Sequence, residues 1–239
     1  REDTMNCLHG KTTVLLDLDG TLVDSVEPHA RSWKEVLQAN GFEVELSKLR
    51  RLIGMGGDKM LQEAVGSLAD DRVEALTQER SQHFRSKQIR DVCAFPKADR
   101  LVDLLRERGL VVRLATAASA KDRDPLLEQG GLDGKFDDFI SSDEVEGSKP
   151  EPDLIKAILD KLGVNPSECL LVGDSPFDAE AAHRAGVEFI GVESGAYTGD
   201  ELPHTDRVFK SITELAEALE SVQPDSDTHN QRGEKVAWI

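Results

Sequence analysis

Apolar residues along this chain form two kinds of pattern, which occupy different parts of the sequence. After residue 95, short blocks that are apolar throughout alternate with amphipathic stretches. Such blocks predict buried parallel strands, and the stretches between them predict helices that cover the sheet. The predicted strands are 14–17, 110–116, 139–141, 169–173, 187–192 and 207–209, and the predicted helices are 97–108, 121–129, 152–162, 177–185 and 212–222.

The segment from residue 26 to about residue 90 has a helical pattern and no β-branched run. Its first helix ends at Asn40-Gly41, a second covers 46–53, Asp58 caps a third, and Asp70 or Asp71 opens a fourth. Pro96 marks the return to alternating helix and strand.

We therefore expect an α/β fold, a Rossmann-like parallel sheet with helices on both faces, plus an inserted four-helix domain. The sheet domain would comprise 11–24 and 96–222, and the inserted domain 25–95. The ends, 1–10 and 223–239, are polar or lack periodicity, so we expect them to be flexible.

Composition narrows the class of protein. The 239 residues carry a net charge of -17, which argues against nucleic acid or an anionic membrane as a partner. Three widely spaced cysteines form no CxxC pattern and are typical of reduced thiols in the cytoplasm. No apolar stretch approaches the roughly 18 residues of a membrane span, and the N-terminal stretch lacks the apolar region of a signal peptide. A cytoplasmic monomer is the expectation.

Two carboxylates follow the first predicted strand. Asp17 and Asp19 are separated by one residue, and Gly20 allows the chain to turn so that both face one point. Carboxylates held this close repel one another unless a divalent cation binds them. A calcium loop is disfavoured, because the later acidic ligands of such a loop do not follow.

Three further polar features stand at the ends of later strands: Thr116, Lys149, and the pair Asp174 and Asp178. Alone, a threonine after a strand is commonly a helix cap, and a lysine before proline is commonly solvated. Because parallel strands end at the same edge of a sheet, all of these groups are expected to meet there.

The chemistry that such a set fits is phosphoryl transfer through a carboxylate. Asp17 would attack phosphorus, and Asp19 would protonate the leaving alcohol and then activate water. Mg²⁺ would be held by Asp17, Asp174 and the main-chain carbonyl of Asp19. The Thr116 hydroxyl and the Lys149 ammonium would bind other phosphoryl oxygens.

These motifs resemble the haloacid dehalogenase-type hydrolase superfamily, in its phosphatase branch with a helical cap inserted after the first strand. The resemblance covers about residues 12–222 and is carried by Asp17-Leu18-Asp19-Gly20-Thr21, Thr116, Lys149 and Gly173-Asp174 with Asp178. It implies that Asp17 is the nucleophile, Asp19 the general acid and base, and Asp174 a metal ligand. It also implies that Asp178 is an outer acid of the metal site.

The same resemblance implies that Thr116 and Lys149 bind phosphate and that the segment 26–95 selects the substrate. Ala117 stands where the family frequently has asparagine, but its backbone N–H can still bind phosphate.

Departures from the family pattern bear on the reaction. Dehalogenases lack the second acid, so Asp19 argues against that activity. His29 and Trp33 resemble the first cap helix of β-phosphoglucomutases, whose cap loop carries a phosphate-binding arginine. Here the loop is Gly54-Met55-Gly56-Gly57-Asp58, without arginine, which favours hydrolysis. Lys59 matches poorly the Schiff-base lysine of phosphonoacetaldehyde hydrolases and is interpreted as a surface lysine.

The cap candidates for substrate contact are His29, Gly56 and Gly57, although the glycines suit a plain interhelical turn equally well. Arg50 and Arg51 are the nearest cap cations along the sequence. The expected function is hydrolysis of a small phosphorylated metabolite, such as a sugar phosphate or phosphoglycolate. The alternatives are a β-phosphoglucomutase-like phosphotransferase and a catalytically idle binding module.

Overall fold

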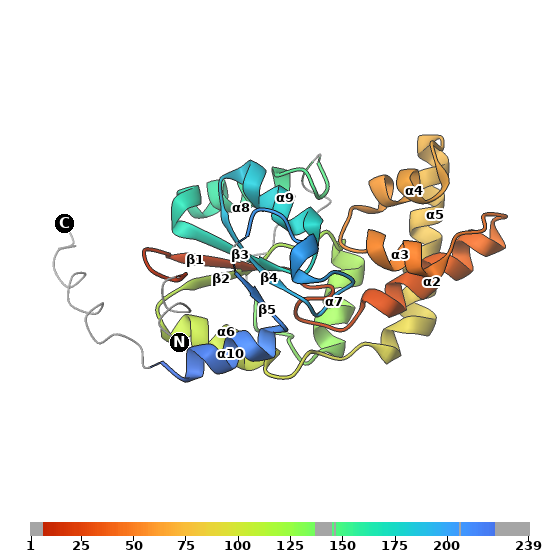
Figure 1. The fold of residues 1–239 in the computed structure, drawn as a ribbon. Helices are drawn as coiled ribbons and strands as arrows, with labels where there is room; N and C mark the ends of the chain where they lie inside the picture. Colours follow the sequence, from red (N-terminus) through yellow and green to blue (C-terminus); the bar gives the residue numbers. More distant parts are fainter. Residues whose placement is uncertain (1–6, 137–144, 146, 206, 223–239) are drawn as a thin grey trace, which may run out of the picture.

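A parallel sheet forms the centre of the molecule (Figure 1). The computed structural model describes residues 7–136, 145, 147–205 and 207–222. Within these residues the sheet has five strands, in the order β2-β1-β3-β4-β5. Their bounds are β1 Thr13–Leu16, β2 Val111–Leu114, β3 Cys169–Gly173, β4 Glu188–Val192 and β5 Val208–Phe209. The expected α/β fold with a parallel sheet is confirmed.

The register of the central strands decides which residues meet at the edge. Leu16 of β1 is paired with Leu114 of β2 and with Val172 of β3. The chain segments that follow these three strands therefore leave the sheet side by side. Strand β2 is shorter than the predicted strand 110–116, and the strand predicted at 139–141 lies outside the described residues.

Successive residues of β1 face opposite sides of the sheet, as the two-residue period of a strand requires. Val14 and Leu16 join a hydrophobic cluster with α6 (Ala98–Glu107), α7 (Ala120–Gln129) and α10 (Ile212–Glu220). Leu15 joins the opposite cluster with α8 (Asp153–Leu162) and α9 (Pro176–Ala185). Helices on both faces are therefore confirmed (Figure 1).

The expected four-helix insertion is also present, and we call it the cap. Its helices have a hydrophobic cluster of their own, which includes Trp33, Leu37 and Leu61. The helices are α2 Val26–Ala39, α3 Leu46–Leu52, α4 Gly57–Val65 and α5 Asp70–His83, which continues into a π-helical turn at Phe84–Gln88 and a 3-10 turn at Ile89–Asp91. Further 3-10 turns cover Pro166–Glu168 and Gly199–Glu201.

Helix α4 begins differently from the prediction. Gly56, not Asp58, is its N-cap residue, so the predicted capping role of Asp58 is wrong. The Asp58 carboxylate lies in the first helical turn and instead accepts a hydrogen bond from the Ser148 hydroxyl at 3.0 Å.

The two connections between cap and sheet run side by side. The Asp24 amide donates to the Cys93 carbonyl at 2.8 Å, and the Phe95 amide donates to the Leu22 carbonyl at 2.9 Å. Both connections are thus anchored close to the end of β1. Within the described part of the chain, no helix has the length and apolar character of a membrane span.

Candidate active site

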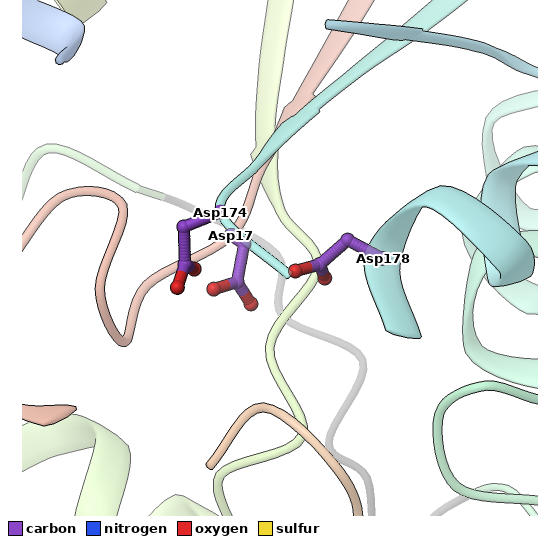
Figure 2. A group of neighbouring side chains, drawn as sticks. All are labelled: Asp17, Asp174 and Asp178. Atoms are coloured by element: carbon purple, nitrogen blue, oxygen red, sulfur yellow. The ribbon is translucent and has the colours of Figure 1, made fainter. Parts of the chain in front are cut away.

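Three buried carboxylates meet at the edge of the sheet (Figure 2). Asp17 follows β1, Asp174 follows β3, and Asp178 lies in the first turn of α9. One oxygen atom of each lies within 4.8 Å of the corresponding oxygens of the other two. The sheet register thus brings together groups that are more than 150 residues apart in sequence, as expected from the motifs.

Lys149 lies between two of these acids. Its Nζ atom is 2.6 Å from Oδ1 of Asp17 and 2.6 Å from Oδ1 of Asp178, and its side chain is 1% exposed. One ammonium group cannot balance three carboxylates. Burial raises the pKa of Asp17 to about 8, and the nearby charge of Asp178 adds to the effect, although Lys149 opposes it.

Burial raises the pKa of Asp174 as well, with a further contribution from the Asp17 charge. The Oδ2 atom of Asp17 is buried and has no hydrogen-bond partner among the described residues. An excess of buried carboxylate oxygens, one of them unpartnered, is the donor set that Mg²⁺ prefers. The residues present therefore fit a magnesium ion.

Close backbone packing fixes the position of Asp174. Gly20 has a φ angle of +81°, and a Cβ atom there would lie 2.4 Å from Oδ2 of Asp174. A Cβ atom on Gly195 would overlap the same oxygen. The Thr21 hydroxyl donates to Oδ1 of Asp174 at 3.1 Å. Glycine is required at these two positions because any side chain would displace the carboxylate.

Asp178 is positioned by the start of α9. Ser175 is the N-cap residue, and its amide donates to Oδ2 of Asp178 at 3.2 Å while its hydroxyl donates at 2.5 Å. Pro176 occupies the first helical position, where a missing N–H costs nothing. This capping box leaves Oδ1 of Asp178 for Lys149.

The Asp19 side chain lies apart from the carboxylate cluster and faces the cap. Its Oδ1 atom accepts a hydrogen bond from Ser25 Oγ at 2.6 Å and lies 2.9 Å from Nε2 of His29. Burial would raise the pKa of Asp19, but His29, then Ser25 and the charge of Arg80, outweigh it and hold that pKa below its usual range.

His29 links this acid to the rest of the cap. Its ring stacks on Phe84 with 3.9 Å between centroids, and its Nδ1 atom lies 3.2 Å from Nη1 of Arg80. Arginine can only donate, so this network assigns Nδ1 as an acceptor and places the His29 proton on Nε2, facing Asp19.

Thr116 and Ala117 lie beyond the end of β2. The Thr116 side chain is buried, and its hydroxyl oxygen accepts a hydrogen bond from the Ala118 amide at 3.1 Å. The hydroxyl proton remains available to an incoming acceptor. Ala117 and Ala118 line the pocket above the carboxylates.

This pocket lies between sheet and cap. Of the three cap residues expected to contact the substrate, His29 and Gly57 line this pocket, whereas Gly56 packs against the core loop that carries Lys149. Arg50 and Arg51 are directed elsewhere, to Glu27 at 3.2 Å and Glu201 at 2.8 Å. The described residues that line the pocket are Asp17, Asp19, His29, Trp33, Leu52, Ile53, Gly54, Met55, Gly57, Met60, Arg80, Ala117, Ala118 and Asp122.

Arg80 and Asp122 form a charged pair in this lining that the sequence did not predict. Arg80 of α5 lies 3.1 Å from Oδ2 of Asp122, and its guanidinium group is 5.1 Å from the centre of the Trp33 ring. Asp122 is 2% exposed and also contacts Arg85 at 2.9 Å. Arg80 and Asp122 each lie among other charged residues in the sequence, so no local signal distinguishes them from solvated residues.

Comparisons with known proteins agree with this geometry. A family model described as haloacid dehalogenase-like hydrolase matches residues 14–192. The phosphoglycolate phosphatase of Rhodospirillum rubrum is 30% identical over 225 residues, covering 90% of this chain and 93% of the relative. The fructose-1-phosphate phosphatase YqaB of Escherichia coli is 28% identical over 180 residues, covering 75% of this chain and 95% of the relative.

A solved structure of a hydrolase from Pseudomonas syringae superposes with a TM-score of 0.82 at 31% identity. The superposition covers 89% of this chain and 99% of that one, cap included. The relatives are named phosphatases and hydrolases, as the motifs led us to expect. This chain belongs to the haloacid dehalogenase-like hydrolase family.

Proposed function

We propose that this protein is a magnesium-dependent phosphomonoester hydrolase that acts on a small metabolite through an aspartyl-phosphate on Asp17. The observation that carries the proposal is the environment of the Asp17 carboxylate. One of its oxygens is held by Lys149. The other is buried beneath a pocket that the cap covers and has no partner in the part of the chain that the structure describes. Such an oxygen has lone pairs available for attack on phosphorus.

In the first step, an Asp17 oxygen forms a bond to phosphorus while the bond from phosphorus to the ester oxygen breaks. Asp19 donates its proton to the leaving oxygen. The free enzyme holds the pKa of Asp19 low, and the negative charge of a bound phosphate would raise it and favour the protonated form. In the second step, Asp19 accepts a proton from water, the water oxygen attacks phosphorus, and the bond to Asp17 breaks.

The remaining residues would position and neutralise the phosphoryl group. A magnesium ion held by Asp17, Asp174 and the main-chain carbonyl of Asp19 would offset the charge that develops on its oxygens. Lys149, the Thr116 hydroxyl and the Ala117 amide would bind oxygens on the other sides. Asp178 would keep the Lys149 ammonium directed at the site.

The roof of the pocket bears on the substrate. Arg80, on the pocket wall, shares the carboxylate of Asp122 with Arg85, which lies outside the lining, so among the described residues these three groups carry one positive charge in excess. The Nε atom of Arg80 is buried and lacks a hydrogen-bond partner within the described ranges. A substrate with a second anionic group, such as 2-phosphoglycolate, would use both features. Relatives up to 32% identical that carry the name phosphoglycolate phosphatase support this choice.

A sugar phosphate is the second candidate. The observation that favours it is Asp122 itself, a buried carboxylate on the pocket wall that could accept hydrogen bonds from sugar hydroxyls. Mutase activity is less well supported, because the loop Gly54-Met55-Gly56-Gly57 contains no cation for a second phosphate. Cys7, Cys93 and Cys169 form no disulfide within the described residues, which suits the reduced cytoplasm that we propose as the location of a monomeric enzyme.

The test is phosphate release by purified protein from p-nitrophenyl phosphate, 2-phosphoglycolate, fructose 1-phosphate and glucose 1-phosphate, with and without Mg²⁺. We expect turnover that depends on the metal. Failure on the whole panel would refute the phosphatase proposal. Conversion of glucose 1-phosphate into glucose 6-phosphate would favour the phosphotransferase alternative.

A further inference from the structure

The loop that carries Lys149 is held by the cap as well as by the core. Residues 56–59, at the start of α4, contact residues 148–151 through main chain and side chains. The Gly56 amide lies 3.4 Å from the Lys149 carbonyl. A Cβ atom on Gly56 would lie 2.1 Å from the Cβ of Ser148, so the two backbones are too close for any other residue at position 56.

Lys59 makes two of these contacts. Its Nζ atom donates to the Ser148 carbonyl at 2.9 Å and to Oε1 of Glu151 at 3.3 Å. Its side chain is 29% exposed, so the ammonium group is partly shielded from solvent. Lys59 is therefore not the plain surface lysine that the sequence suggested.

The opposite side of the loop is fixed to the core. Arg184 of α9 lies 3.1 Å from Oε2 of Glu151, and the Glu151 amide donates to the Ser148 carbonyl at 2.9 Å. The Ser148 carbonyl thus accepts one bond from the loop itself and one from Lys59 of the cap. Lys149 and Pro150 lie between these two anchored positions, and the Lys149 ammonium group bridges Asp17 and Asp178.

We propose that Asp58 and Lys59 are positioning residues for Lys149. When the cap closes, they hold the 148–151 loop so that the Lys149 ammonium lies at the phosphate site. Closure of the cap over a substrate then also completes the phosphate site. Water, and any substrate that does not close the cap, would meet an incomplete site. The catalytic consequence rests on the function proposed above, whereas the restraint on the loop does not.

The first measurement is the inhibition constant of inorganic phosphate in phosphatase assays of Lys59→Met and Asp58→Asn. Lys48→Met is the matched control, because Lys48 is a cap lysine that donates to Ala64 within the cap at 3.2 Å. Losing a hydrogen bond from a charged group typically weakens binding about tenfold or more. We expect that rise in the inhibition constant for Lys59→Met, a smaller one for Asp58→Asn, and none for Lys48→Met. Lys59→Arg should restore most of the affinity.

A fall in the amount of folded protein would not produce this result, because the inhibition constant is a property of the active molecules alone. An inhibition constant in Lys59→Met within twofold of the unmodified protein would overturn the positioning role.

The second measurement does not need an active enzyme. Amide hydrogen exchange of peptides that span 147–153 should accelerate in Lys59→Met but not in Lys48→Met. If the unmodified protein hydrolyses nothing and this difference still appears, the function is wrong but the restraint on the loop stands. Equal exchange in the two variants would refute the restraint itself.

Discussion

The Nε2 atom of His29 lies 2.9 Å from the Oδ1 atom of Asp19, so a cap residue contacts the acid that we assign to proton transfer. His29 is held by stacking on Phe84 and by Arg80, both outside the sheet. His29 therefore adds a contact from the cap to the bond that Ser25 already makes with the same Asp19 oxygen. Proton transfer and cap closure are thereby connected through one hydrogen bond.

Replacing His29 by asparagine should lower kcat in a way that depends on the leaving group. An alkoxide leaving group needs a proton from Asp19, whereas p-nitrophenolate is a weak base that needs little help. We expect a loss of about 100-fold with 2-phosphoglycolate or fructose 1-phosphate and a much smaller loss with p-nitrophenyl phosphate. Exposed His9 provides the control, and His9→Asn should leave both rates unchanged. Equal losses on both kinds of substrate would contradict a role in proton transfer.

Asp17→Asn should abolish turnover, with kcat reduced by at least about 1000-fold, because the amide is not a nucleophile. The fold should persist, since the substitution is isosteric and lowers the number of buried carboxylates in contact with Asp174 and Asp178. Circular dichroism would establish the fold, and mass spectrometry after acid quenching should detect a phosphorylated peptide only in the unmodified protein. Residual activity of a tenth or more in the variant would rule out Asp17 as the nucleophile.

Magnesium binding should become tighter as the pH rises. Burial holds the pKa of Asp17 at about 8 in the metal-free protein and raises that of Asp174 as well, so near pH 7 a cation must displace protons from the cluster. Calorimetric titration with Mg²⁺ in two buffers of different ionisation enthalpy should detect proton release. The affinity should increase between about pH 6 and about pH 9. In Asp174→Asn, the proton release and the pH dependence of the Mg²⁺ affinity should both diminish. An Mg²⁺ affinity of the unmodified protein that is independent of pH would show that the cluster is ionised without metal.

The sheet and the groups at its edge could be predicted because each depends on a local signal. The apolar block before Asp17 ends where the strand ends, and parallel pairing then places Asp17 and Asp174 together wherever the intervening chain goes. The same argument placed Lys149 and Thr116 near them. No geometric detail of the cap was needed.

The residues that the sequence did not reveal depend on contact between cap and core. Arg80 and Asp122 are 42 positions apart on different helices, and each is surrounded by other charges in the sequence. Lys59 was misread for the same reason, since only the tertiary structure brings it against the Ser148 carbonyl. Conversely, Arg50 and Arg51 are close in sequence to the cap loop that lines the pocket, but they pair with Glu27 and Glu201.

Arg80 provides the test of substrate choice. Arg80 and Arg85 both pair with Asp122, at 3.1 and 2.9 Å, but only Arg80 is among the residues that line the pocket. Arg80→Met and Arg85→Met therefore remove the same charge from the same acid, but only Arg80→Met alters the pocket wall and the contact to His29.

If Arg80 binds the second anionic group of the substrate, kcat/KM of Arg80→Met for 2-phosphoglycolate should fall by about 10- to 100-fold, the usual effect of losing a charge-assisted hydrogen bond. The loss should be smaller for fructose 1-phosphate, which lacks that group. Arg85→Met should lower both values equally and only modestly. Both substrates have alkoxide leaving groups, so loss of the contact to His29 would affect them alike, and the ratio of the two kcat/KM values isolates recognition. An unchanged ratio in Arg80→Met would eliminate Arg80 as the determinant of an anionic substrate and leave the sugar phosphates, with Asp122 as their hydroxyl acceptor.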